Sequence, residues 1–296
     1  MSSNLELYAY EAYTAVNNMA MAFHLSATNT EGAALRVPCT YQIAEPGFRP
    51  FRSGKASPEE LQGAFDEIVG LAVDRGIDLG IESDDSVTKI ALQQGLGIDC
   101  SNFAARALTA VHAHLELPAF YTSVYRAADD IRRLHHDKGS WVAKDNDGND
   151  RLLTGEEAQH LATEEWLSID WIATVFGKDP EFITGSSHLT SEQSARKVYP
   201  VETLPGDVIA FEKAGKAVVS HVGVVEAVVA EDDGIRVDFW HSWHTRDFES
   251  GLRRDRVLVH DNGTSQWSHP GLGDSLRYQG YYFARPIGLD ALVKSL

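Results

Sequence analysis

The spacing of hydrophobic residues changes from a helical to a strand period near Pro205. Before that point, apolar residues recur every three or four positions in several segments, the first over residues 5–25, which is typical of amphipathic helices. After it, short apolar runs are separated by Gly, Asp and Asn, which is typical of strands and turns. Helices followed by strands predict an α+β fold, in which a helix packs on an antiparallel sheet.

Residues 57–76 carry a full set of helix end signals. Ser57 can cap this helix, and Pro58 suits its first position. Glu60 can complete a capping box with Ser57, and Gly76 can end the helix. We therefore expect a well-defined helix between these residues.

A further helix is predicted to begin at a cysteine. Asp99 is a favourable N-cap residue, and Cys100 follows it in the first turn. The predicted helix has one continuous apolar face, which consists of Phe103, Ala104, Ala107, Leu108, Val111 and Leu115. This face favours packing against the later strands. Five strands are expected, at residues 207–212, 217–229, 235–243, 256–260 and 280–286.

Composition and charge restrict the function classes. The chain has 296 residues, of which 43% are hydrophobic and 23% charged, and its formal net charge is −17. An acidic surface repels nucleic acid and anionic lipid, so we expect neither as a partner. The sequence shows no secretory signal and no membrane span. A cytoplasmic location is therefore the default prediction, with signal-independent export or delivery as the alternative.

The two cysteines, Cys39 and Cys100, are too few for a disulfide framework and lack the spacing of a zinc site. Cys39 lies in the apolar, strand-like run LRVPCTYQI and is interpreted as a buried structural thiol. Cys100 has two interpretations. It is either a small buried apolar residue, or a thiolate that the helix dipole and the N–H groups at the helix start stabilise.

An imidazole nearby would make the second interpretation chemically productive, because it would stabilise the thiolate and act as acid and base. His221 is the candidate, since it lies mid-strand between apolar residues, where a histidine without a partner is unfavourable. Gly223 shares its strand face and leaves room beside the ring. We expect Cys100 Sγ and a ring nitrogen of His221 to lie within about hydrogen-bond reach. The alternative is a satisfied structural histidine.

Three segments, DCSNFAARAL, LPGDVIAFE and SHVGVVE, resemble the signatures of the NlpC-type cysteine peptidases and amidases. This family belongs to the papain-like superfamily and is related to CHAP and other amidase domains. The resemblance implies a papain-like core, in which a cysteine-bearing helix packs on an antiparallel sheet of about five strands. It also implies hydrolysis of amide bonds, most often in bacterial cell-wall peptide, with Cys100 as nucleophile and His221 as base.

The same resemblance implies a division of the chain. Residues 1–95 would form a helical N-terminal extension, and residues 96–290 the catalytic domain. The long gap between the cysteine and histidine segments implies a mostly helical insertion at about 127–195, which we expect to wall the cleft and narrow substrate choice. One departure from the family pattern is Asn102, which stands where Gly is usual.

The residue that orients the base is expected on the strand after His221. By strand alternation, one face of this strand holds Ile235, Val237, Phe239 and His241. Because this set is apolar until its last member, it is predicted to face the core and the helix, which places His241 beside His221. The alternative is His244: some amidases of this kind have a His-Thr pair that fits His244, and a strand bulge would bring it to the same face.

The segment DNDGNDRLLTGE matches a calcium-binding loop at most ligand positions. The residues that would bind the ion are Asp145, Asp147, Asn149, Arg151 (through its carbonyl) and Glu156. Asp150 stands at the sixth position, where Gly is expected, and the preceding segment makes a poor incoming helix. The alternative interpretation is a hairpin or loop rich in turn formers. Calcium is the cofactor that the sequence suggests, and the predicted hydrolysis requires none.

Two functions of different classes follow from these patterns. The first is a cysteine-dependent amide hydrolase, an endopeptidase or amidase, that uses Cys100, His221 and His241. Its partner would be a peptide or amide substrate, with peptidoglycan fragments favoured by the resemblance. The second is a non-hydrolytic papain-like module used for binding or acyl transfer. The two differ in thiol reactivity, because a thiolate reacts at a lower pH than a structural thiol.

Overall fold

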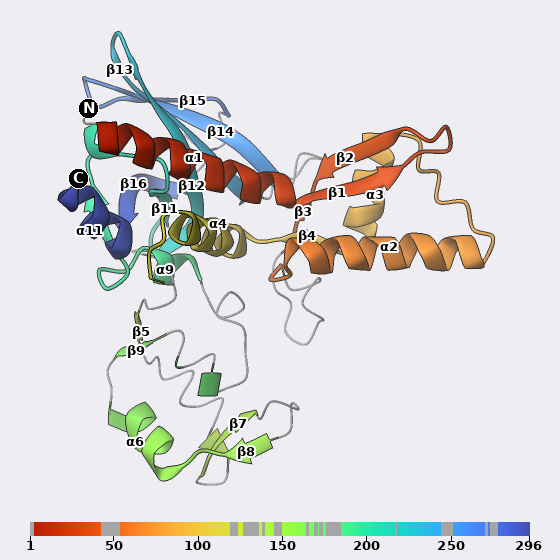
Figure 1. Ribbon diagram of the computed structural model, residues 1–296, viewed down its shortest axis with the longest axis horizontal. Coiled ribbons are helices and arrows are strands. Elements are labelled where there is room, and N and C mark those ends of the chain that lie inside the picture. Colours follow the sequence, from red (N-terminus) through yellow and green to blue (C-terminus); the bar gives the residue numbers. More distant parts are fainter. Residues whose placement is uncertain are drawn as a thin grey trace.

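The computed structural model describes residues 3–42, 54–118, 124–126, 136–137, 140–144, 150–163, 166–168, 171, 174–175, 185–216, 218–243, 251–269, 272 and 278–296. It shows helices packed around a large antiparallel sheet (Figure 1). The predicted α+β class is therefore confirmed.

The large sheet has seven strands in the order β10–β16–β11–β12–β13–β14–β15, and all neighbouring pairs are antiparallel. Its strands are β10 (Ala195–Val198), β11 (Val208–Lys213), β12 (Val219–Glu231), β13 (Gly234–Trp243), β14 (Gly251–His260), β15 (Ser265–Trp267) and β16 (Tyr278–Pro286). The predicted number of about five strands was wrong. The sequence pattern missed β10 and β15, which are short edge strands and bury few residues, so they carry little periodic signal.

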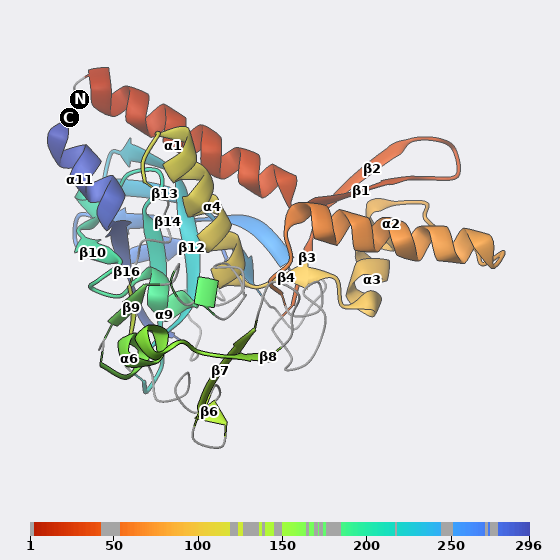
Figure 2. The same ribbon diagram turned by 60° about the horizontal axis from the view of Figure 1, so that its bottom comes forward.

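Two helices cover one face of this sheet. In Figures 1 and 2, α1 (Ser3–Ala22) and α4 (Cys100–His114) cross the same face, and both contact β12. Their apolar residues meet those of the sheet in a helical core, which includes Ala12, Val16, Phe103, Leu108, Val208, Val222 and Val224. The predicted apolar face of the cysteine helix is buried in this core, apart from the partly buried Leu115. This arrangement fixes the start of α4 against the middle of the sheet.

The opposite face of the sheet has its own core, rich in aromatic rings. This aromatic core includes Ile209, Phe211, Val237, Phe239, Trp243, Val257 and Phe283. Successive residues of a strand point to opposite faces, so Val208 and Ile209, for example, belong to different cores. The central strands are therefore apolar on both faces, so an apolar strand face does not by itself show on which side α4 lies.

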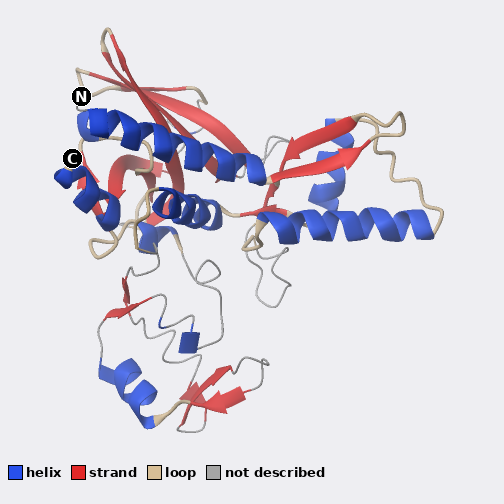
Figure 3. Cartoon of the chain, in the orientation of Figure 1, coloured by secondary structure: helices blue, strands red, loops and turns tan. Residues whose placement is uncertain are grey.

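The N-terminal region is less helical than predicted. A hairpin of β1 (His24–Thr28) and β2 (Ala34–Pro38) stands beside α2 (Pro58–Asp74) and α3 (Asp84–Gln94) in a lobe at one side of the sheet (Figure 3). The parallel pair β3 (Thr40–Tyr41) and β4 (Gly97–Ile98) joins the lobe to α4. The predicted capping box of α2 is present, since Ser57 and Glu60 exchange hydrogen bonds of 2.7 and 3.2 Å. Helix α1 itself packs in the helical core, against α4 and β12.

The segment predicted as a mostly helical insertion contains strands as well as helices among its described residues. The described strands of this region are β5 (Val124–Arg126), β6 (His136–Asp137), β7 (Ser140–Lys144), β8 (Asp150–Leu152) and β9 (Trp166–Ser168). The described helices are α6 (Gly155–Thr163) and the short α9 (Ser186–Leu189). Most of residues 127–195 lie outside the described part of the chain, so the mostly helical insertion stays a prediction. The last of these helices, α9, contacts α4 and β12, so it lies on the Cys100 side of the sheet.

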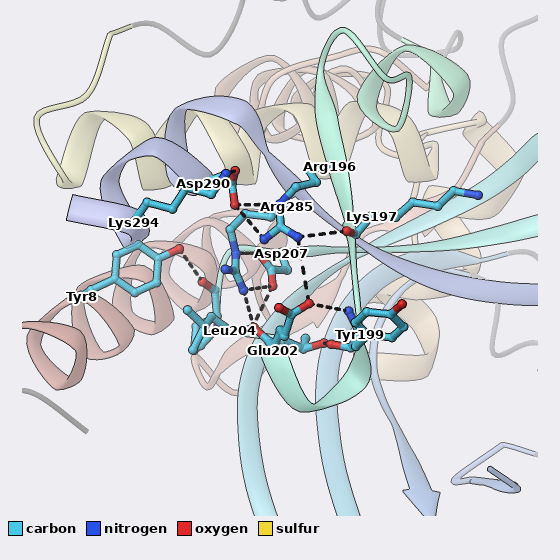
Figure 4. A network of polar contacts seen from close by, with 12 residues as sticks. Tyr8, Arg196, Lys197, Tyr199, Glu202, Leu204, Asp207, Arg285, Asp290 and Lys294 are labelled. Carbon is cyan, nitrogen blue, oxygen red and sulfur yellow. Dashed lines mark hydrogen bonds and ion pairs between the residues drawn. The ribbon is translucent and has the colours of Figure 1, made fainter. Parts of the chain in front are cut away.

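A buried ion pair ties the start of β11 to the end of β16 (Figure 4). Arg285 Nε donates to Asp207 Oδ1 over 2.8 Å, and Arg285 Nη2 donates to Asp207 Oδ2 over 2.9 Å. The Leu204 N–H also donates to Asp207, and Arg285 reaches the carbonyl of Glu202, which closes the short helix η3 (Pro200–Glu202). Next to this pair, Arg196 binds Asp290 of the last helix, α11 (Ile287–Ser295).

Replacing Arg285 by methionine is expected to lower the free energy of unfolding by about 3 to 5 kcal/mol, because it leaves a buried carboxylate without its partner. Burial raises the pKa of Asp207 to about 6 against the opposing pull of Arg285. A carboxyl group whose folded pKa lies above its unfolded value removes stability as the pH rises through that interval, here from about 4 to 6. Because Arg285 lowers this pKa, removing it raises the pKa further, so the variant loses more stability than the unaltered protein as the pH rises. Urea unfolding at pH 5 and pH 8 should show the larger difference between the two proteins at pH 8.

The control is Arg196→Met, which removes an exposed arginine of the same network and should cost about 1 kcal/mol or less. In the double variant D207N/R285M the buried charge is gone, so part of the lost stability should return. Equal losses for Arg196→Met and Arg285→Met would contradict the assignment of the stabilising role to the buried pair.

Candidate functional site

The start of α4 places Cys100 against the sheet. Asp99 is the N-cap residue, as predicted, and its side chain accepts from the Asn102 N–H over 2.7 Å. The Cys100 side chain belongs to the helical core, and the residue is only 5% exposed. Its sulfur lies 3.6 Å from Ser186 Oγ at the start of α9, and the main-chain N–H of Val222 is close enough to lower the pKa of the thiol. The thiol therefore docks on β12 at the peptide that joins His221 to Val222.

Burial has the largest effect on this thiol and raises the pKa of Cys100. The Asp99 carboxylate raises it further, whereas the hydrogen bonds from Ser186 and Val222 and the charge of Lys55 lower it. The expectation that the helix start would favour the thiolate is thus only partly met, because loss of solvation outweighs the favourable contacts. Cys39 is also buried, and burial raises its pKa, which agrees with a structural thiol.

Two histidines and an aspartate form a continuous chain of hydrogen bonds across three strands. His221 Nε2 on β12 lies 2.7 Å from His241 Nδ1 on β13, and His241 Nε2 lies 2.9 Å from Asp255 Oδ2 on β14. The contact predicted between His221 and His241 is therefore present. All three residues are buried, with exposed fractions of 2%, 0% and 4%. His244, the alternative to His241, lies outside the described residues.

The pKa shifts of His241 and Asp255 determine where the protons lie along this chain of hydrogen bonds. Burial lowers the pKa of His241 although Asp255 raises it, so this ring is neutral at pH 7. Burial would raise the pKa of Asp255, but the hydrogen bond from His241 and the nearby Arg253 outweigh it and keep the carboxylate ionised. A neutral His241 must then donate from Nε2 to Asp255 and accept at Nδ1 from His221 Nε2. In its neutral form, His221 then carries the lone pair on Nδ1, which is the form that a general base requires.

The chain of histidines does not lie on the face that the sequence predicted. His221 is paired with Phe211 in the sheet, and its ring contacts that of Phe211, with ring centroids 5.3 Å apart, in the aromatic core. The His241 ring contacts Phe239 in the same core. Val222, by contrast, faces the helical core together with Cys100. The apolar set on β13 therefore faces away from α4, which corrects the predicted orientation.

A direct bond between Cys100 and His221 was expected and is not formed. Within the described part of the chain, the sulfur has Ser186 and the Val222 amide as hydrogen-bond partners, whereas His221 Nε2 is directed to His241. The two residues are nevertheless neighbours, because the sulfur contacts the peptide next to His221. The register of β12 with β13 begins only at Val224 and Trp240, so His221 lies where these strands diverge. The segment before α4 fills this gap, and Ser242 Oγ donates to the Ile98 carbonyl over 2.7 Å.

Gly223 has the role that its position suggested. A Cβ atom there would lie 2.9 Å from Phe239 Cδ2 and 3.1 Å from His241 Cβ. Only glycine therefore leaves room for the His241 ring beside His221 without displacing its neighbours. This close approach lets the two imidazoles meet across the diverging strands.

Three further residues of the site were not singled out from the sequence. Asp255 lies at an inward position of a β-strand, where an acidic residue is unusual, and this position was the available signal. Ser186 and Lys55 come from segments far from the cysteine in the chain. Lys55 Nζ lies 3.0 Å from Asp99 Oδ2. No local pattern marks either residue, because only the packing of α9 and of the segment before α2 brings them to α4.

The predicted calcium loop falls largely on residues that the structure does not describe. Asp145, Asp147 and Asn149 lie outside the described residues, and the side chain of Arg151 is likewise not described. Glu156 is exposed in the first turn of α6. The described strands β7 and β8 pair antiparallel with Lys144 opposite Asp150, which is compatible with the hairpin alternative. No cluster of His, Cys, Asp and Glu that could hold a metal ion occurs among the described residues, and calcium stays a prediction.

A scan against protein-family models and searches of curated proteins and of solved structures find no match to this chain. None of the helices in the described part of the chain is long and apolar enough to cross a membrane. The proposal for the function therefore rests on the geometry of the residues themselves.

Proposed function

We propose that this chain is a cysteine-dependent amide hydrolase, with Cys100 as nucleophile and His221 as general base. The observation that supports it best is the chain of hydrogen bonds from Asp255 through His241 to His221. Burying polar side chains of this kind costs free energy on folding. The direction of the hydrogen bonds leaves a basic ring nitrogen on His221, whose main chain lies close to Cys100 at the start of α4.

The proposed reaction has the two stages of covalent amide hydrolysis. Cys100 Sγ gives its proton to His221 Nδ1 and attacks the amide carbonyl carbon, forming a tetrahedral oxyanion near the Cys100 N–H at the start of α4. The C–N bond breaks as His221 returns the proton to the leaving amine, which leaves a thioester on Cys100. Water then gives a proton to His221 and attacks the thioester, and the thiol is restored when the acid leaves.

The described geometry does not itself bring the base to the nucleophile. The sulfur already contacts the peptide that follows His221, at the point where β12 and β13 diverge. Catalytic hydrogen bonds are often long or misaligned without substrate and form when it binds. We infer that the reaction requires the main chain around His221 on β12 to move, because the His221 ring lies with the aromatic core and Cys100 with the helical core on the opposite face of the sheet.

The substrate class is an amide in a peptide. The resemblance of the cysteine and histidine segments to NlpC-type enzymes favours bacterial cell-wall peptide, and a papain-like core is part of the same proposal. A cytoplasmic location stays a prediction of the sequence.

A second candidate function is a non-hydrolytic module that uses the same fold for binding or acyl transfer. The observation that favours it is the state of the thiol. Cys100 is buried, its pKa is raised by burial, and its sulfur contacts a hydroxyl and a main-chain amide in place of an imidazole. A thiol in this state is weakly nucleophilic.

The rate of alkylation by iodoacetamide as a function of pH separates the two functions. For a hydrolase, Cys100 should be alkylated by iodoacetamide, or captured by a peptide aldehyde analogue, well below about pH 8. Cys39 is an internal control, because it should react only when the chain unfolds. Equal reactivity of the two cysteines in the native protein, with and without a peptide aldehyde, would favour the non-hydrolytic module.

A further inference from the structure

A lysine from the N-terminal lobe reaches the start of α4. Lys55 Nζ lies 3.0 Å from Asp99 Oδ2 and 2.7 Å from Ser101 Oγ. Ser101 Oγ in turn donates to Asp99 Oδ1 over 2.8 Å. The side chains of Lys55 and Asp99 are only 9% and 14% exposed, so the two charges interact with little screening by solvent.

The backbone around this lysine is held in place by α4 itself. The Asp99 N–H donates to the Gly54 carbonyl over 3.0 Å, and Asn102 Nδ2 donates to the Ala56 carbonyl over 2.9 Å. Lys55 lies between these two anchors. Its ammonium group is therefore directed at the helix start by main-chain contacts on both sides and does not depend on a flexible surface position.

Asp99 has two opposing effects at the start of α4, and Lys55 can cancel the unfavourable one. Its carboxylate caps α4, which stabilises the helix, but it also stands beside the Cys100 thiol and disfavours a second negative charge there. A cation bound to the carboxylate removes this repulsion and leaves the cap in place. It also accounts for a mostly buried lysine, which is rare in proteins unless it is paired.

We propose that Lys55 is a positioning residue of the site, which holds the Asp99 cap and neutralises its charge so that Cys100 can ionise. The catalytic meaning of this inference rests on the proposed hydrolase function. It extends that function to the N-terminal lobe, because the segment that leads into α2 supplies the positive charge of Lys55.

The test measures the pKa of the Cys100 thiol from the ultraviolet absorbance of the thiolate, with the Cys100→Ser variant subtracted. Lys55→Met should raise this pKa by about one unit, which is a tenfold loss of thiolate at a given pH below it. Lys55→Arg keeps the charge and should stay close to the unaltered protein. Asp99→Asn keeps a good helix cap and leaves the ammonium unopposed, so the pKa should fall.

The double variant K55M/D99N should return the pKa close to that of the unaltered protein, because both charges are gone. An unchanged pKa in Lys55→Met, or in Asp99→Asn if Lys55→Met does not fold, would overturn the inference. Slow alkylation of Cys39 reports that each variant is folded. Peptide hydrolysis is not measured here, so a protein without hydrolase activity would disprove the proposed function and leave this result standing.

Discussion

Replacing Cys100 by alanine is expected to abolish amide hydrolysis. Without a nucleophilic sulfur no thioester can form, and only the binding groups and oxyanion donors at the start of α4 remain. Removing the nucleophile of a covalent hydrolase lowers kcat by roughly 10⁵- to 10⁶-fold. The measurement is the release of amine from peptidoglycan-derived peptides, followed with the purified variant and the unaltered protein at the same concentration.

The matched control is the second cysteine. Cys39→Ala also removes a buried thiol, but Cys39, between β2 and β3, has no part in the proposed reaction, so turnover should stay near that of the unaltered protein. Unfolding measurements on both variants separate a loss of chemistry from a loss of fold. Full turnover by Cys100→Ala would disprove the hydrolase, and loss of turnover in both variants would point to instability.

The local features of the site could be predicted because they depend on neighbours in the chain. An Asp followed by an apolar period of 3.6 residues predicts a capped helix, and α4 begins at Cys100 with Asp99 as its cap. The contact of His221 with His241 could be predicted for a similar reason. Strand alternation favoured His241 over His244 as the partner of His221, and the two rings do meet.

The face on which the histidines lie could not be predicted. Alternation tells which residues share a face of a strand, but it does not tell which face a helix will cover. In this sheet both faces are apolar, so the apolar set that ends in His241 fits the aromatic core as well as the helical core. Asp255 and Lys55 were missed because their roles depend on strand order and on packing between distant segments.

His241→Ala is expected to slow hydrolysis by roughly ten- to ten-thousand-fold while leaving measurable turnover. His241 Nδ1 accepts a hydrogen bond from His221 Nε2–H and thereby favours the tautomer with its lone pair on His221 Nδ1. Without this acceptor, His221 can take the other tautomer and can rotate, so fewer molecules hold a competent base. Substrate binding does not use this ring. Steady-state kinetics should therefore show a lower kcat with KM nearly unchanged.

Two further variants show that orientation, and not simple loss of packing, is responsible. His241→Asn keeps an acceptor oxygen near His221 Nε2 and should restore part of kcat, whereas Asp255→Asn perturbs the chain one residue further out and should cost about 10- to 100-fold. His244→Ala should stay close to the unaltered protein. If His244→Ala were slow and His241→Ala normal, β13 would have to bulge before His244, and His244 would be the residue that orients the base. Turnover equal to that of the unaltered protein in His241→Ala, His241→Asn, Asp255→Asn and His244→Ala would instead mean that the hydrogen bonds from Asp255 to His221 serve only to hold β12, β13 and β14 together.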